Sequence, residues 1–240
     1  MRTLYQDIVE AKAVGKRLLA VLIDPEKFDL ENTSIFFERV NTSIATHIFV
    51  GGSTDKEQCI TEVVLEIKKH TSLPVILFPG DIDQITNNAD GLLFLSLISG
   101  RNPEYLIGKH IEAVSKLKGM DLEVIPTGYI LIENGKQTAV ERVSQTTPMK
   151  REAIQTIGDT AKAGELLGMK LMYLEAGSGA THPVPSTIIS HIKSEINIPL
   201  IVGGGIRTKE QLDNAYKTGA DIVVVGTALE NDNNFLNKLS

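Results

Sequence analysis

Two carboxylates in this sequence lie at or near the ends of apolar runs, where a charged side chain is expected to be buried. Asp24 closes the apolar run LLAVLID, and Glu175 lies near the end of the run KLMYLEAGS. A lone carboxylate at such a position is costly unless it is paired, hydrogen-bonded or bound to a cation. Asp24 is therefore a candidate ligand for a hard cation such as Mg²⁺, with Ser53 as a further oxygen donor. An ion pair with Lys27, or a cap on the following helix, explains Asp24 nearly as well.

Glu175 has the side chain of a general base, and it can equally anchor a substrate hydroxyl. The alternative is a carboxylate that pairs with an arginine or with a helix dipole. Tyr173, two residues earlier, can donate a hydrogen bond to a phosphate or can simply pack. The five histidines show no paired spacing, so we assign them no metal site.

Glycine-rich turns follow two of the late apolar runs. IVGGGIRT contains Gly203, Gly204 and Gly205, and VVVGTALE contains Gly226 and Thr227. Glycine lets bare backbone N–H groups approach an anion, and a helix N-terminus adds a favourable partial charge. Together the two turns predict a phosphate site. The alternative is a pair of tight strand-to-helix turns with no ligand.

The segments that must position these groups are short and apolar almost throughout. Such runs are typical of strands buried on both faces, as in a parallel sheet covered by helices. Helical patterns lie between most of them; Ile60, Val63, Val64 and Ile67 are one example. The apolar runs are 18–24, 47–53, 74–80, 91–99, 122–130, 170–178, 199–205 and 221–227.

Eight strands that alternate with helices over 240 residues predict an α/β fold, a (β/α)₈ TIM barrel. A doubly wound open sheet is the alternative. We expect one domain over residues 1–240. In a barrel the carboxyl ends of all strands meet at one face, so the two carboxylates and the glycine turns should lie close together there.

Three segments add detail to the barrel. Residues 81–90, DIDQITNNAD, are too few and too polar for a covering helix, so the helix after the third strand should be absent or reduced. Residues 131–149 form a long connection that we expect to be a loop excursion near the mouth, in the manner of a lid. At the N-terminus, Leu4, Ile8 and Ala11 share one face of a predicted helix.

Composition excludes several classes of protein. The chain has 30 acidic and 24 basic residues, a net charge of −6 and no basic run, which argues against a nucleic-acid partner. Cys59 is the only cysteine, so an intramolecular disulfide and a cysteine-rich zinc site are excluded. No apolar run approaches the about 18 residues of a membrane span, and no signal peptide begins the chain. We therefore expect a cytoplasmic protein.

The motifs in their order resemble the geranylgeranylglyceryl phosphate synthase family, which includes the PcrB heptaprenyl enzymes of bacteria. The segments are LIDPEK, VGGS, YLEAGSGA, VGGGIRT and VVVGTALE, with SGRNPEYLIG (99–108) and IPTGYILIENG (125–135) as further matches. The resemblance covers essentially the whole chain. It implies a modified barrel whose third helix is absent or remodelled. It also implies an enzyme that joins sn-glycerol 1-phosphate to a prenyl diphosphate with Mg²⁺ as cofactor.

The resemblance also implies roles for individual residues. Asp24 and Ser53 would hold the metal, and Lys27 and Arg101 would bind the diphosphate. Tyr105 stands where members that stop at geranylgeranyl carry a bulky aromatic, which implies a C20 donor. Glu175 would be the base or only a hydroxyl anchor, and Asp24 would also be catalytic. Glycerol 1-phosphate would bind to Tyr173, Leu174, Glu175, Ala176, Gly177, Ser178, Gly179, Gly204, Gly205, Gly226 and Thr227.

Two other functions fit the same barrel. A phosphosugar isomerase shares the late phosphate turns, but it needs an acid–base partner across the barrel, and PTGY at the end of the fifth strand offers no carboxylate. A non-catalytic sensor of a phosphorylated ligand would leave the candidate metal site without a purpose. The resemblance favours the prenyltransferase, working as a homo-oligomer with transient membrane contact at most.

Overall fold

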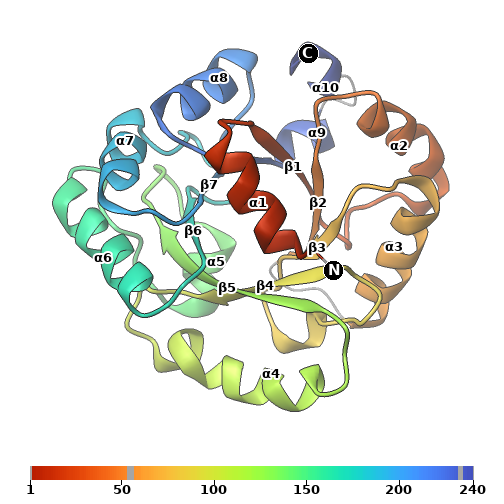
Figure 1. Ribbon diagram of the computed structural model, residues 1–240, viewed down its shortest axis with the longest axis horizontal. Coiled ribbons are helices and arrows are strands. Elements are labelled where there is room, and N and C mark those ends of the chain that lie inside the picture. The colour runs from red at the N-terminus through yellow and green to blue at the C-terminus, as the bar shows by residue number, and fades with distance from the viewer. Residues whose placement is uncertain (1, 53–56, 232–234, 240) are drawn as a thin grey trace.

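Eight parallel strands close into a barrel in the computed structural model, which describes residues 2–52, 57–231 and 235–239 (Figure 1). Each strand is hydrogen-bonded to the next in sequence order, and β8 pairs with β1. The predicted barrel is confirmed and the open sheet is excluded. The strands are β1 (Leu18–Ile23), β2 (His47–Val50), β3 (Val75–Leu77), β4 (Gly91–Ser96), β5 (Glu123–Leu131), β6 (Leu171–Glu175), β7 (Leu200–Gly203) and β8 (Ile222–Val225).

Helices surround the barrel (Figure 1). None of those in the described part of the chain is long and apolar enough to cross a bilayer. The α-helices are α1 (Leu4–Ala13), α2 (Thr33–Asn41), α3 (Glu57–His70), α4 (Lys109–Leu117), α5 (Ala139–Ser144), α6 (Ile154–Leu166), α7 (Ser186–Glu195), α8 (Lys209–Thr218), α9 (Thr227–Asn231) and α10 (Phe235–Leu239). The short turns are η1 (Leu30–Asn32), η2 (Ile82–Gln84) and η3 (Glu104–Gly108).

Helix α1 closes the barrel at the end where the strands begin. It crosses the centre of the ring in Figure 1, and its Ile8 and Ala11 are buried with the side chains of the barrel interior. Glu123, the first residue of β5, accepts hydrogen bonds from the N–H groups of Leu4 at 2.5 Å and Tyr5 at 2.9 Å. A carboxylate there satisfies N–H groups of the first helical turn and complements the helix dipole. A ligand can therefore reach the barrel interior only from the opposite end, where the strands finish.

The connection between β3 and β4 lacks a covering helix, as residues 81–90 predict. It contains only η2, a single 3₁₀ turn of three residues. On the far side of this gap, α4 is preceded by η3, a π-helical turn. The outer wall of the barrel is thus thinned beside β4.

The connection 131–149 is not a simple loop excursion, and that expectation is corrected. It holds α5, which starts with a capping box between Thr138 and Glu141, and it pairs Ile132 with Met149 in an isolated bridge. The capping box satisfies two N–H groups of the helix start, which gives this short helix a defined beginning. A folded element therefore stands beside the mouth of the barrel.

Candidate active site

A cavity opens at the carboxyl ends of the strands and collects most of the predicted residues. Its volume, ≈ 360 Å³, is typical of a pocket for a small ligand. Residues far apart in the sequence meet there because parallel strands end at the same face. The predicted residues that line the cavity are Asp24, Lys27, Tyr105, Tyr173, Glu175, Gly177, Ser178, Gly179, Gly204, Gly205, Gly226 and Thr227.

Some predicted residues lie elsewhere. Leu174 and Ala176 are buried in the apolar layer between barrel and helices, because alternate residues of a strand face opposite sides. Arg101 faces a separate surface depression, and its guanidinium donates to the carbonyl oxygens of Ile98 at 3.3 Å and Gly100 at 2.6 Å. Ser53 lies outside the described residues.

Glu175 is a buried carboxylate at the floor of the cavity. It ends β6, and its Oε1 accepts a hydrogen bond of 2.5 Å from the N–H of Gly177. Burial raises the pKa of Glu175 from 4.5 to about 7, and the Gly177 N–H offsets only part of that rise. A carboxyl with a near-neutral pKa exchanges a proton readily at physiological pH, which is what a general base needs.

Tyr173 places a buried hydroxyl beside this carboxylate. The hydroxyl makes no hydrogen bond of normal geometry among the described residues, although it lies close enough to Glu175 to favour the charged form of that carboxyl. Its ring packs against Phe78 and Tyr129, with both ring-centroid distances at 5.3 Å. A buried hydroxyl that finds no partner is expensive, so its orientation into a cavity indicates that a polar ligand atom completes it.

The glycine turns need glycine for structural reasons as well as chemical ones. Gly204 and Gly205 have φ values of +82° and +74°, a region that side chains disfavour. A Cβ on Gly205 would also lie 2.9 Å from the backbone nitrogen of Pro183. Across the cavity, Thr227 Oγ1 accepts from the Gly179 N–H at 3.2 Å and contacts Ser178 Oγ at 3.3 Å. The loops after β6, β7 and β8 are thereby gathered around a space bordered by bare backbone.

Asp24 forms an ion pair at the mouth of the cavity and belongs to no preformed cage of acidic or histidine side chains in the described part of the chain. Its carboxylate is 22% exposed and pairs with Lys27 Nζ at 2.5 Å, which is the ion pair weighed from the sequence. No group of three or more His, Cys, Asp or Glu side chains in the described part of the chain could hold a metal. Mg²⁺ requires no such group, because one or two carboxylates with water and substrate phosphates are its usual ligands. The donor set therefore fits Mg²⁺ bound together with a phosphorylated substrate.

An apolar arm of the cavity reaches between η2 and α4. Its lining includes Ile82, Ile85, Leu92, Phe94 and Ala113. We call this arm the side groove. It occupies the place where the third helix is missing, and its lining is mainly apolar.

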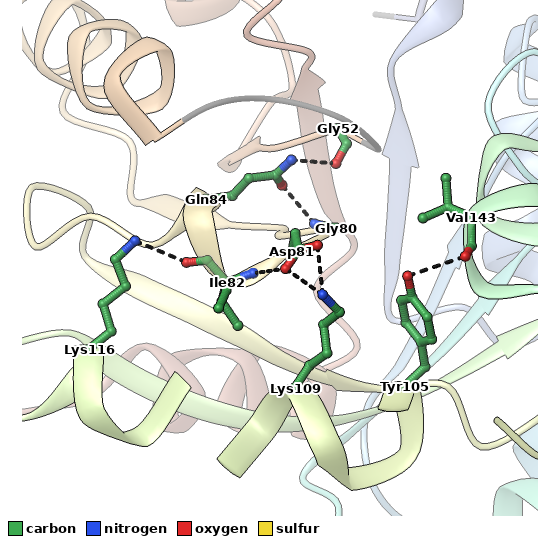
Figure 2. Close-up of polar contacts among 9 residues, drawn as sticks. All are labelled: Gly52, Gly80, Asp81, Ile82, Gln84, Tyr105, Lys109, Lys116 and Val143. Atoms are coloured by element: carbon green, nitrogen blue, oxygen red, sulfur yellow. Dashed lines mark hydrogen bonds and ion pairs between the residues drawn. The ribbon is translucent and has the colours of Figure 1, made fainter. Parts of the chain in front are cut away.

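Tyr105 stands between the side groove and the α5 side of the mouth. Its hydroxyl donates a long hydrogen bond of 3.4 Å to the carbonyl of Val143 (Figure 2). The ring is half-buried beside the interior side chains of the barrel. It therefore restricts the space available beside the side groove.

Several residues of the cavity were not among the predicted ones. Phe78 and Tyr129 form its aromatic floor with Tyr173, and Arg142 and Arg207 contribute cations to its lining. Phe78 and Tyr129 lie at or near strand ends, and that position could have marked them as candidates for the cavity. Arg142 gave no signal, because the helix that carries it was expected to be a loop.

The chain is similar to known proteins along almost its whole length. The model described as PcrB family matches residues 7–239. The geranylgeranylglyceryl phosphate synthase of Zunongwangia profunda is 57% identical over 96% of this chain and 98% of that protein, and that of Flavobacterium johnsoniae is 53% identical over 98% and 97%. Among solved structures, (S)-3-O-geranylgeranylglyceryl phosphate synthase from Thermoplasma acidophilum, in complex with the substrate sn-glycerol-1-phosphate, superposes with a TM-score of 0.93. The two sequences are 33% identical, and the match covers 100% of this chain and 96% of that one.

The pKa of Glu175 predicts how stability depends on pH. Because the folded-state pKa of about 7 is above the unfolded value of 4.5, the folded protein binds more protons between these values. The free energy of unfolding should therefore fall as pH rises from 4.5 to 7, by about 3 kcal/mol from this group.

Urea unfolding of the wild type and of Glu175→Gln at several pH values measures this effect. The difference between the two proteins should change across this range and level off above it. The subtraction removes His47, whose burial lowers its pKa to about 4 and gives the opposite slope. A constant difference from pH 4.5 to 8 would contradict the prediction.

Proposed function

The chain belongs to the PcrB family, and from that premise we propose that it transfers a geranylgeranyl group from geranylgeranyl diphosphate to sn-glycerol 1-phosphate. The reaction forms an ether bond and releases diphosphate. The observation that carries the proposal is one continuous cavity that joins a phosphate-sized space between glycine turns, a buried base and an apolar side groove. The isomerase and the sensor offer no use for the side groove.

Glycerol 1-phosphate binds, in this proposal, between the loops after β6, β7 and β8. Gly204, Gly205, Gly226 and Thr227 border the phosphate with backbone rather than with bulky side chains. The unpartnered hydroxyl of Tyr173 donates to an acceptor oxygen, which relieves the cost of its burial. A phosphate held in this way fixes the glycerol hydroxyl relative to Glu175.

Glu175 then serves as the base. The glycerol oxygen attacks the first carbon of the prenyl chain, and the bond from that carbon to the diphosphate oxygen breaks with its electron pair leaving on diphosphate. The hydroxyl proton passes to the carboxylate of Glu175. The aromatic floor of Phe78, Tyr129 and Tyr173 faces the reacting region, and ring faces stabilise positive charge on an allylic carbon.

Asp24 would hold Mg²⁺ together with the diphosphate. The metal, when bound, neutralises negative charge that grows on the leaving group. Lys27 lies within reach of the same diphosphate, since it already pairs with Asp24 at the mouth. Arg142 lines the mouth from α5, and we add it to the residues that attract the diphosphate. The homo-oligomer that the family resemblance implies stays a prediction.

The single experiment that tests the proposal uses labelled acceptor. The protein is incubated with radiolabelled sn-glycerol 1-phosphate, geranylgeranyl diphosphate and MgCl₂, and the label that passes into an organic extract is counted. We expect extractable label only when both substrates are present. A reaction without donor, and one with the mirror-image glycerol phosphate, are the controls. No extractable label above these controls would contradict the proposed activity.

Asp24→Asn should keep the fold and lose activity. An amide is a poor ligand for Mg²⁺, so we expect kcat/KM to fall by about a hundredfold or more. The rate is measured in a titration with MgCl₂, and the melting temperature reports on folding. Asp29→Asn is the matched control, because Asp29 is exposed and lies outside the cavity lining. A wild-type rate for Asp24→Asn at the same Mg²⁺ concentration would rule out the metal role.

Gly226→Ala tests the phosphate site with little damage to the fold. A Cβ on Gly226 would meet Leu22 at an ordinary contact distance of 3.4 Å, whereas one on Gly205 would collide with backbone. The added methyl group intrudes on the phosphate, so we expect KM for sn-glycerol 1-phosphate to rise about tenfold. KM for the prenyl diphosphate should stay nearly unchanged, and equal rises for both substrates would contradict the assignment.

Tyr105→Ala tests the limit on chain length. Removal of an aromatic ring from the edge of the side groove leaves apolar space that stays open. We expect the variant to accept prenyl diphosphates longer than C20, with KM for sn-glycerol 1-phosphate unchanged. Product length is measured by mass spectrometry with a C15 to C35 donor series. The same cutoff as wild type would mean that Tyr105 does not set the length.

A further inference from the structure

The side groove has two walls that belong to different segments, and charged side chains join them. Asp81 caps η2 on one wall, and Lys109 begins α4 on the other (Figure 2). Lys109 Nζ donates to both carboxylate oxygens of Asp81, each at 2.8 Å. Both residues line the cavity. The ion pair therefore spans from wall to wall of a channel that is mainly apolar, with His110 as a further polar residue of its lining.

A further bridge joins the same two walls. Lys116, seven residues after Lys109, donates from Nζ to the carbonyl of Ile82 at 3.2 Å (Figure 2). Residues seven apart lie on the same side of an α-helix, and Ala113 lies between them on that side. The small side chain of Ala113 leaves room for a chain between the two bridges, where a larger residue would fill the groove.

The η2 wall is fixed to the barrel mouth on its other side. Gln84 is fully buried, accepts from the Gly80 N–H at 2.7 Å and donates to the carbonyl of Gly52 at 2.9 Å. The wall that carries Asp81 is thus anchored at its base by a buried amide, whereas toward α4 it is held by half-exposed lysines. Separation of the walls at the Asp81–Lys109 bridge is the cheaper movement.

We propose that the Asp81–Lys109 ion pair closes the side groove over the prenyl chain and so determines how tightly donors of different length bind. The inference rests on the proposed function, because it takes the side groove to hold the donor tail. Both residues act through the groove walls and not on the reacting atoms, so they are positioning residues.

The electrostatics fit a bridge that persists in the free protein. The hydrogen bond to Asp81 raises the pKa of Lys109, with smaller contributions from nearby acidic and phenolic groups. Asp81 Oδ1 also accepts from the Ile82 N–H at 2.6 Å, which orients the carboxylate toward α4. Lys109 Nζ lies 6.0 Å from the centre of the Tyr105 ring, so the bridge also adjoins the side chain proposed to limit chain length.

The test measures donor binding without acceptor, by titration calorimetry with geranyl, farnesyl and geranylgeranyl diphosphate. The variants are Asp81→Asn, Lys109→Met, the double variant and Lys109→Arg. We expect each single neutralisation to weaken the binding of geranylgeranyl diphosphate about two- to fivefold, because a half-exposed ion pair contributes a free energy of that size. Geranyl diphosphate should change little, because its short tail stops before the bridge. The double variant should be no weaker than either single one, and Lys109→Arg should bind as the wild type does.

Asp81→Asn is the decisive variant. If Lys109 instead binds the diphosphate directly, loss of Asp81 frees the ammonium, and binding stays equal or becomes tighter; that result would overturn the bridge. Equal weakening of all three donors would overturn it too. Lys68→Met is the matched control, because Lys68 pairs with Asp90 at 2.6 Å with similar exposure but lies outside the cavity lining. It should leave all donor affinities at the wild-type value.

The outcomes for the wild type separate this inference from the proposed function. Donor binding without transfer to sn-glycerol 1-phosphate would contradict the proposed function, while the dissociation constants of the variants would still decide on the bridge. No binding of any prenyl diphosphate by the wild type would overturn the bridge together with the assignment of the side groove.

Discussion

The rest of this structure depends on how the outer face of β4 is covered. A strand buried on both faces must be covered, yet between β3 and β4 only the 3₁₀ turn η2 is available. Leu92 is nonetheless fully buried and Phe94 half-buried. Their cover comes from α4 and from the polar ties that draw η2 and α4 together. The side groove is the space that this incomplete cover leaves. Omission of a helix usually removes part of a hydrophobic core. Here it gives the barrel mouth an apolar extension.

At the cavity floor, the buried carboxylate of Glu175 requires a polar partner, whereas β4 requires apolar cover. Burial disfavours its charged form and moves its pKa close to neutrality, which makes it useful as a base and costly as a structural group. Tyr173 adds a buried hydroxyl without a partner in the described structure. Both groups are better satisfied by a ligand with hydroxyl and phosphate oxygens than by the protein alone. In the proposed function, stability lost at the floor in the free protein would be regained on binding, a common arrangement in active sites.

The sequence predicted the barrel well, because strands buried on both faces leave continuous apolar runs and the missing helix leaves too few residues. It also predicted which strand ends meet at the cavity. It did not predict the direction in which individual side chains point. Motif 173–179 is contiguous, but the two-residue period of a strand turns Leu174 and Ala176 away from the cavity. Arg101 follows β4, yet its guanidinium folds back on local carbonyls, a choice that depends on three-dimensional neighbours. Asp81 and Lys109 lie 28 residues apart and carry no local pattern that pairs them.

The charges around the cavity support the proposed role of a cation from solution. Lys27 already pairs with Asp24, and Lys109 with Asp81, so two of the lysines at the cavity bring little net positive charge to an incoming anion. The guanidinium of Arg207 donates to the carbonyl of Ala180. Two phosphorylated substrates would add several negative charges to a partly buried space, which the backbone N–H groups of the glycine turns offset only in part. Asp24 can exchange its lysine for a divalent cation that also binds diphosphate, and the released Lys27 can then meet the same group. In the proposed reaction, the paired carboxylate at the mouth would thus let a nearly neutral cavity bind an anion once metal and donor are both present.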